Sequence, residues 1–190
     1  MITNILLTGV GGQGILLAAR IIASAAQNAG FDVTTNEIHG MAQRGGSVTA
    51  QIRYGQEVLS PLILEGTADA FGALEPIEAL RYSHYLKPEA TAVVASRPII
   101  PITVSSGQAV YPDNLKERLN KTFPKLKFID FDAIALEKFK NIKVANTILL
   151  GTLSTGLSLP GNAWSNAIAQ CVKSAYVELN ENAFEYGRNL

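Results

Sequence analysis

The first third of the chain passes from an apolar run into a glycine-rich turn and then into a second apolar run. Residues 2–8 predict a buried strand, because short Ile- and Leu-rich runs that end at glycine are typical of parallel strands. A Leu-, Ile- and Ala-rich stretch over 15–29 predicts a helix ending at Gly30. Residues 31–35 predict a second strand, so the chain is expected to open with a βαβ unit.

The pattern then changes to a polar loop followed by strict alternation. Residues 37–46 carry three glycines and no clean period, which predicts a loop. Residues 47–54 alternate apolar and polar side chains, which predicts a half-buried strand, and residues 54–56 are typical of the tip of a hairpin. An antiparallel pair in a mostly parallel sheet would make that sheet mixed.

The remaining two thirds predict strands and helices in alternation, with helices throughout the end of the chain. Pro76 is suited to the first turn of a helix running to about residue 86, and Asp113 to the cap of another, to about residue 122. The expected strands are 68–74, 91–96 and 127–130. The further expected helices are 132–139 and 144–187, the latter with a break near 159–161. Residues 97–112 are expected to form a long ordered loop. Together these predict one three-layer α/β domain over residues 1–190, with a mixed, mostly parallel sheet and a helical C-terminal third.

Composition narrows the classes of protein that this chain can be. Hydrophobic residues make up 47% and charged residues 17%, which argues against disorder. The 16 basic and 16 acidic residues balance, which argues against binding to nucleic acid. No apolar run reaches the roughly 18 residues of a membrane span, and the start lacks the features of a signal peptide, so a cytoplasmic protein is expected. Cys171 is the only cysteine, which excludes a disulfide framework, a cysteine zinc site and an iron–sulfur cluster held by this chain alone.

The glycine-rich turn after the first strand is the clearest candidate binding site. Gly9, Gly11 and Gly14 match the dinucleotide-binding fingerprint, in which glycines let a phosphate approach the backbone and the helix N-terminus attracts an anion. Glu37 lies where a ribose-binding carboxylate is expected. The alternative is that the glycines serve only close packing. Gly12 and Gln13 in the variable positions, and the lack of a substrate domain with a hydride-transfer acid or base, argue against an ordinary NAD site.

The polar loop over residues 39–46 is the second candidate. Because it follows the second strand, it is expected at the ligand-binding edge of the sheet, facing the glycine turn, with Arg44 aimed at an anion or at a partner's carboxylate. A solvent-exposed turn is the alternative. His39 is a possible base but is more typical of a surface or packing residue. No catalytic triad, phosphate-binding loop, thiamine-binding motif or metal-binding motif is present, so no catalytic residue and no metal ligand is assigned to this chain.

Three other residues or pairs have simpler interpretations. Glu78 and Arg81, three residues apart on a predicted helix, are expected to form a surface salt bridge. His84 is expected to cap a helix end. Cys171, within an apolar helical stretch, is expected to be buried and inert.

Several motifs in order along the chain resemble the gamma-type subunit of the 2-oxoacid:ferredoxin oxidoreductases. The first two are the glycine turn, 9–14, and the segment 40–48. The others are 68–69, 75–81, 97–101, 145–151 and 178–187, so the resemblance covers essentially the whole chain. The Met-Ala-Gln-Arg sequence at 41–44 and the Arg-Pro-Ile sequence at 97–99 are most similar to the beta subunit of the indolepyruvate type.

This resemblance implies a reaction and a division of labour between chains. A 2-oxo acid, here an aryl pyruvate such as indolepyruvate, is decarboxylated on thiamine diphosphate, electrons pass through 4Fe-4S clusters to ferredoxin, and coenzyme A takes the acyl group. Thiamine diphosphate, Mg²⁺ and the clusters are expected on a large partner subunit. The resemblance implies that this chain completes the assembly, covers part of the partner's active-site region and contacts coenzyme A. The residues carried over for that face are Gly9, Gly11, Gly12, Gln13, Gly14, Gln43, Arg44, Gly45 and Gly46.

Two other functions stay open on the sequence. One is a free-standing NAD(P)- or nucleotide-binding Rossmann-like protein built on the glycine turn. The other is a non-catalytic nucleotide-sensing or scaffold domain. An accessory subunit is expected to expose a larger apolar patch than a monomer does, and to form a homodimer or leave that patch bare when isolated.

Overall fold

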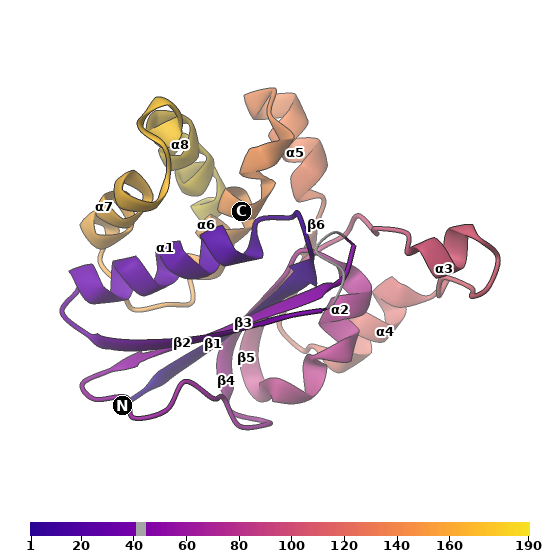
Figure 1. Cartoon of the computed structure of the whole chain (residues 1–190), viewed down its shortest axis with the longest axis horizontal. Helices are drawn as coiled ribbons and strands as arrows, with labels where there is room; N and C mark the ends of the chain where they lie inside the picture. The colour runs from indigo at the N-terminus through magenta and orange to yellow at the C-terminus, as the bar shows by residue number, and fades with distance from the viewer. Residues whose placement is uncertain (41–44) are drawn as a thin grey trace.

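A six-stranded sheet forms the centre of the molecule (Figure 1). The structure is a computed structural model, and it describes residues 1–40 and 45–190, without the side chains of 102 and 103. The sheet order is β2-β3-β1-β4-β5-β6. The strands are β1 (Thr3–Val10), β2 (Asp32–His39), β3 (Ser47–Gly55), β4 (Ala68–Ala73), β5 (Leu86–Ala95) and β6 (Leu126–Ile129).

The sheet is mixed and mostly parallel, as predicted. Strands β1, β4, β5 and β6 pair in parallel, whereas β3 pairs antiparallel with both β1 and β2. Leu7 at the centre of β1 lies opposite Ala50 of β3 on one side and Gly72 of β4 on the other. Because β3 lies between β1 and β2, the expected βαβ opening is split by an inserted strand. The hairpin joins β2 to β3, so the predicted hairpin tip at 54–56 was wrong.

Helices cover both faces of the sheet and give the predicted three layers (Figure 1). On one face lie α1 (Ile15–Asn28), α5 (Phe131–Phe139), α6 (Ala145–Ser154), α7 (Gly161–Cys171) and α8 (Val177–Arg188). On the other lie α2 (Pro76–Arg81) and α4 (Leu115–Thr122). Four short elements complete the described helices: η1 (Ser83–Tyr85), α3 (Ile102–Ser105), η2 (Ile142–Val144) and η3 (Ser174–Tyr176). Helix α7 begins after Pro160, at the predicted break.

Helix α6 is the centre of the larger core, and all ten of its residues are buried. It touches β4, β5, α1, α5 and α8. Its contact with α8 is made backbone to backbone, because a Cβ placed on Gly151 would lie 2.0 Å from the Phe184 carbonyl oxygen. A Cβ on Gly187 would lie 2.1 Å from the carbonyl oxygen of Ile148. Thr152 Oγ1 donates to the Gly187 carbonyl at 2.9 Å and fixes the two helices in register.

Strands β2 and β3 differ from their predicted form. β2 continues to His39, so Glu37, Ile38 and His39 lie in a strand and not in the predicted loop. β3 is buried on both faces and is not half-buried, and the segment after it hydrogen-bonds to the side chains of Gln51 and Arg53. The side chain of Gln51 accepts a hydrogen bond from Ile63 N at 2.7 Å there, which satisfies its buried amide oxygen.

Some predicted helix boundaries were also wrong. The helix opened by Pro76 stops at Arg81 and a 3₁₀ turn follows, so β5 starts five residues earlier than the expected residue 91. Asp113 does not cap α4: its N-cap is Asn114, which makes no side-chain capping bond. Asp130 instead caps α5, accepting from Ala133 N at 2.9 Å.

Candidate functional site

The glycine turn joins the carboxyl end of β1 to the N-terminus of α1. Gly12 and Gly14 have φ angles of 105° and 83°, a left-handed conformation that costs glycine little and other residues more. Gly14 is the N-cap of α1 and provides no side-chain acceptor, and no acidic residue lies in the first turn. The first N–H groups of α1 therefore have no side-chain cap and give this end a partial positive charge.

Gln13 ties the turn to the neighbouring strand. Its Oε1 accepts a hydrogen bond from Val10 N at 2.7 Å, and its Nε2 donates to the Leu74 carbonyl at 2.6 Å. Both ends of the amide are thus used to fix β1 against the end of β4. The primary role of Gln13 in the described structure is to shape the turn.

Asn146, at the start of α6, supports the turn from the helical side. Its Nδ2 donates to the Gly14 carbonyl at 3.2 Å, and its Oδ1 accepts from Thr147 Oγ1 at 3.4 Å. The side chain lies where a Cβ on Gly14 would be, at 2.3 Å from its Nδ2. Glycine is needed at position 14 both for its φ angle and for this contact.

The end of the polar loop lies against the glycine turn, as the sequence predicted. Gly11 N donates to the Gly46 carbonyl at 2.8 Å, and Gly45 N approaches the Gly11 carbonyl at 3.5 Å. Gly45 has a φ of 78°. Two of the other candidate residues, Gln43 and Arg44, lie outside the described residues.

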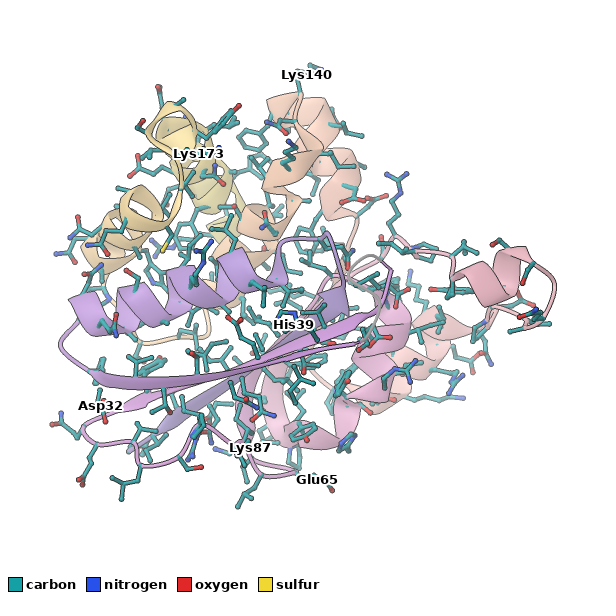
Figure 2. All side chains as sticks on the ribbon, in the orientation of Figure 1. Asp32, His39, Glu65, Lys87, Lys140 and Lys173 are labelled. Atoms are coloured by element: carbon teal, nitrogen blue, oxygen red, sulfur yellow. The ribbon has the colours of Figure 1, made fainter. Side chains whose placement is uncertain are left out.

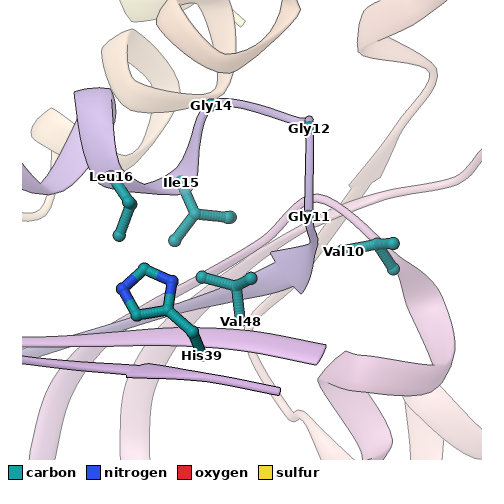
Figure 3. Close-up of a pocket in the computed structure, with 8 residues that line it drawn as sticks. All are labelled: Val10, Gly11, Gly12, Gly14, Ile15, Leu16, His39 and Val48. Carbon is teal, nitrogen blue, oxygen red and sulfur yellow. The ribbon is translucent and has the colours of Figure 1, made fainter. Parts of the chain in front are cut away.

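A cavity of about 320 Å³ opens on the β2 side of the turn. Figure 3 shows the His39 ring facing Ile15 and Leu16, with the glycines of the turn above. His39 Nε2 lies 3.7 Å from Glu37 Oε2, and the His39 side chain is half exposed. His39, for which a surface or packing role was favoured over that of a base, therefore lies beside Glu37, the candidate ribose carboxylate. The lining residues are Val10, Gly11, Gly12, Gly14, Ile15, Leu16, His39 and Val48.

A larger cavity, about 580 Å³, opens on the α6 side of the same turn. Asp132 and Lys143 bring opposite charges to its wall, beside the four residues Gly11 to Gly14. Burial raises the pKa of the Asp132 carboxyl, while Arg97, whose Nη1 lies 3.5 Å from Asp132 Oδ2, acts in the opposite direction. The other lining residues are Leu17, Leu74, Ile99, Ile142, Ala145 and Asn146.

Gly9 takes no part in either cavity lining. It lies in β1 opposite Val48, and a Cβ there would lie 2.8 Å from Gln13 Oε1 and 2.9 Å from Ile15 Cδ1. Its lack of a side chain lets the turn fold back onto β1. At Gly9, the geometry therefore agrees with the alternative that a fingerprint glycine serves close packing.

Beside the turn, Glu78 and Arg81 form the predicted salt bridge, but Glu78 is buried and belongs to a network that also includes Glu75. Glu78 Oε2 accepts from Ser47 Oγ at 2.5 Å, and Oε1 accepts from Arg81 Nε at 3.1 Å. Glu75 caps α2 through Glu78 N at 3.0 Å. Its other oxygen accepts from Tyr111 Oη at 2.7 Å, and burial together with this bond raises the pKa of Tyr111. The network joins β3, α2 and the segment before α4.

The structure brings together most of the predicted site and adds residues that the sequence did not reveal. Asp132, Lys143 and Asn146 reach the turn from positions over a hundred residues away, and only Asn146 lay within a segment singled out beforehand. Cys171 is half-buried, not fully buried, and burial raises the pKa of its thiol. Within the described ranges, no three His, Cys, Asp or Glu side chains are grouped to hold a metal ion. In the same ranges, no helix is long and apolar enough to cross a membrane.

Comparisons with known proteins agree on one family. Residues 4–190 match the family described as pyruvate ferredoxin/flavodoxin oxidoreductase. The chain is 43% identical to "Indolepyruvate oxidoreductase subunit IorB" of Thermococcus kodakarensis, over 97% of this chain and 93% of that protein. It is also 43% identical to the protein of the same name from Archaeoglobus fulgidus, over 98% and 94%. In structure it resembles a keto/oxoacid ferredoxin oxidoreductase gamma subunit from Geobacter sulfurreducens, with a TM-score of 0.72, 25% identity and coverage of 98% and 96%.

Proposed function

Because the chain belongs to the pyruvate ferredoxin/flavodoxin oxidoreductase family, we propose that it is the accessory subunit of a 2-oxoacid:ferredoxin oxidoreductase. The observation that carries this proposal is the similarity to named oxidoreductase subunits along nearly the whole of both chains. The turn offers backbone N–H groups and cavities on both of its sides. Residues 1–190 are proposed to act as one gamma-type domain.

We propose an aryl pyruvate, with indolepyruvate as the representative, as the 2-oxo acid that the complex oxidises. The support is the name carried by relatives at 43% identity. The reaction is the oxidative decarboxylation of the 2-oxo acid with coenzyme A to an acyl-CoA and CO₂, with ferredoxin as the electron acceptor. The cytoplasmic location stays a prediction from the sequence.

The redox cofactors of this reaction do not fit on this chain. A 4Fe-4S cluster needs about four cysteine thiolates, and the chain has one cysteine. Mg²⁺ and thiamine diphosphate are placed on the partner on the strength of the family resemblance. We therefore assign the clusters, thiamine diphosphate and Mg²⁺ to a large partner subunit, which also delivers electrons to ferredoxin.

Coenzyme A contact is proposed for the glycine turn. The uncapped N-terminus of α1 favours an anion, and the cavities of about 320 and 580 Å³ on its two sides leave room for a ligand. Gly11, Gly12 and Gly14 line both cavities. Gln43 and Arg44 are kept as proposed contacts on the strength of the resemblance.

We infer that the large subunit covers a leucine-bearing surface on the segment that follows β3. Leu59, Leu62 and Leu64 are 89%, 56% and 73% exposed. Hydrogen bonds hold this segment in place, from Val58 N to Asp32 Oδ2 at 2.8 Å and from Arg53 Nη1 to the Ser60 carbonyl at 2.6 Å. An ordered segment that presents three leucines to water is suited to a permanent partner.

The test is reconstitution with the large subunit. Anaerobic co-expression is expected to yield a complex that reduces a viologen dye only with coenzyme A and faster with indolepyruvate than with 2-oxoglutarate. Leu59→Ser with Leu62→Ser is expected to release the chain, whereas Leu136→Ser, an exposed leucine on α5, is the matched control. Recovery of an inactive chain without a partner would contradict the proposal. Saturable NADH binding by the isolated chain would favour the Rossmann-like alternative, and a homodimer sealed by the same leucines would reassign that surface.

A further inference from the structure

A third cavity, about 470 Å³, lies on the helical face of the molecule, away from the β2 side of the glycine turn. Its walls come from α1, from η2 with the residue before it, and from the segment that runs from the end of α7 into α8. Arg20, Lys143 and Lys173 bring three positive charges to it from three separate segments. The remaining lining residues are Leu17, Asn141, Val144, Cys171, Val172, Tyr176, Leu179 and Asn180, so the lining contains no carboxylate.

Seven of the described lysines and arginines form ion pairs, whereas these three cations do not. Lys121, Lys125 and Lys138 each lie within 3.1 Å of a glutamate oxygen. Arg20, Lys143 and Lys173 form no ion pair with any carboxylate of the described residues. Figure 2 labels Lys173 beside the C-terminal helices. In a chain with no net charge, a concave site with three unpaired cations attracts an anion that carries more than one charge.

The rest of the lining suits an organic ligand. Leu17, Val144, Val172 and Leu179 supply apolar walls, and Tyr176, about half exposed, offers an aromatic face. The volume falls within the range of roughly 300–1,000 Å³ typical of small-molecule sites. Leu17 and Lys143 also line the larger cavity beside the glycine turn, so the two spaces are neighbours.

We propose that this basic cavity, defined by Arg20, Lys143 and Lys173, binds the phosphate groups of an organic di- or triphosphate. The cations neutralise the phosphates while the apolar walls and Tyr176 take the organic part. This proposal does not depend on the accessory role proposed above, because all the residues that line the cavity belong to this chain.

Calorimetric titration of the full isolated chain in phosphate-free buffer tests the proposal, with ADP, ATP, coenzyme A and inorganic pyrophosphate as probes. ADP or ATP is expected to bind saturably, and to bind more weakly as salt is raised; coenzyme A, proposed above for the glycine turn, is the comparison. Arg20→Gln and Lys173→Gln, which do not line the cavities of the glycine turn, are each expected to weaken binding about tenfold. Lys116→Gln, an exposed lysine on α4, is the control. Melting temperatures verify that each variant is folded.

Cys171 gives an independent readout, because it is the only cysteine and it lines this cavity. A bound organic phosphate is expected to slow its alkylation by a maleimide, and the slowing should be lost in Lys173→Gln. Absence of saturable binding up to millimolar concentrations of all probes would overturn the proposal. So would binding that the Arg20 and Lys173 variants leave unchanged, or binding of pyrophosphate as tight as that of the nucleotides, which would indicate a plain anion site. Loss of oxidoreductase activity in a reconstituted complex would bear on the accessory role and not on this site.

Discussion

The side-chain amide of Asn146 fills the position that a Cβ of residue 14 would take, and it donates to the Gly14 carbonyl at 3.2 Å. Two segments separated by more than a hundred residues therefore meet with no room between them. The start of the buried helix α6 fixes the start of α1, and with it the direction in which the glycine turn presents its N–H groups. The site's geometry thus depends on the C-terminal half of the chain.

Gly14→Ala is expected to lower the free energy of unfolding by about 2–4 kcal/mol, since it adds a steric clash to the cost of a left-handed φ. Gly12→Ala is the matched control, because Gly12 also has a positive φ but a Cβ there meets nothing within 4 Å. It should cost about 1 kcal/mol. Urea unfolding followed by circular dichroism measures both. Equal losses for the two variants would mean that the Asn146 contact contributes nothing.

Gln13→Glu tests the amide that bridges Val10 and Leu74. The carboxylate can still accept from Val10 N, but it cannot donate to the Leu74 carbonyl, so a loss of about 1–3 kcal/mol is expected at pH 7. Protonation restores a donor, and the loss should therefore shrink as the pH falls through the range of a carboxyl pKa. Gln56→Glu, at an exposed position, is the control. A loss that does not change between pH 7 and pH 4 would count against the bridging role.

Gly151→Ala is expected to destabilise the fold strongly, by about 3 kcal/mol or more, because its Cβ would collide with the Phe184 carbonyl. Gly156→Ala is the comparison, since the tightest contact there is an ordinary 3.6 Å and its φ is not positive. That variant should be neutral or slightly stabilising. Thermal melting distinguishes the two, and a Gly151 variant as stable as the wild type would mean that α6 and α8 can separate at little cost.

Asp132→Asn is expected to change the stability of the fold by an amount that depends on pH. Burial raises the pKa of Asp132 in the folded state above its unfolded value, so ionisation disfavours the fold. The neutral Asp132 carboxyl contributes its full stabilisation below the pKa of the unfolded state, and this stabilisation is lost as the pH rises through the pKa of the folded state. The stability of the Asn variant relative to the wild type should therefore increase from pH 3 to pH 7. The opposite slope would show that the ion pair with Arg97 outweighs burial.

Lys140→Gly is expected to stabilise the chain by about 0.5–1 kcal/mol. Lys140 ends α5 with a φ of 53°, the only non-glycine residue with a positive φ in the described ranges, and glycine takes this conformation at less cost. Its side chain extends into solvent (Figure 2). Lys140→Ala, which keeps the strain and removes the charge, is the control. A rise in melting temperature shared by both variants would assign the gain to charge and not to backbone conformation.

The sequence was sufficient to predict elements that depend on local patterns. The apolar run before Gly9, the helix that follows Gly14 and the break at Pro160 are set by neighbouring residues, and all three were placed well. Strand partners were predicted less well, because the alternation in 47–54 indicates a strand but does not say that it enters the sheet between β1 and β2. The error at residues 54–56 follows from this.

Local patterns do not report which distant segments meet, so the candidate site was predicted only where it is continuous in sequence. The fingerprint located Gly11 and Gly14, with Gly12 between them, and the expectation that residues 45–46 face the turn was correct. Asp132 and Lys143 carry no local signal, since an acid in a helix and a lysine in a short helical turn are common on any surface. Glu78 was interpreted as a surface partner of Arg81 because spacing alone does not report burial.

The antiparallel insertion of β3 also determines when this protein can fold during synthesis. The central strand β1 emerges first, but both of its neighbours, β3 and β4, are made later and end at Gly55 and Ala73. No native pairing of β1 can form between strands adjacent in the sequence, and such long-range pairing slows folding. During synthesis, β1 therefore cannot be paired on both sides until Ala73 has been made, which is more than a third of the 190 residues, and α6 and α8 are made later still.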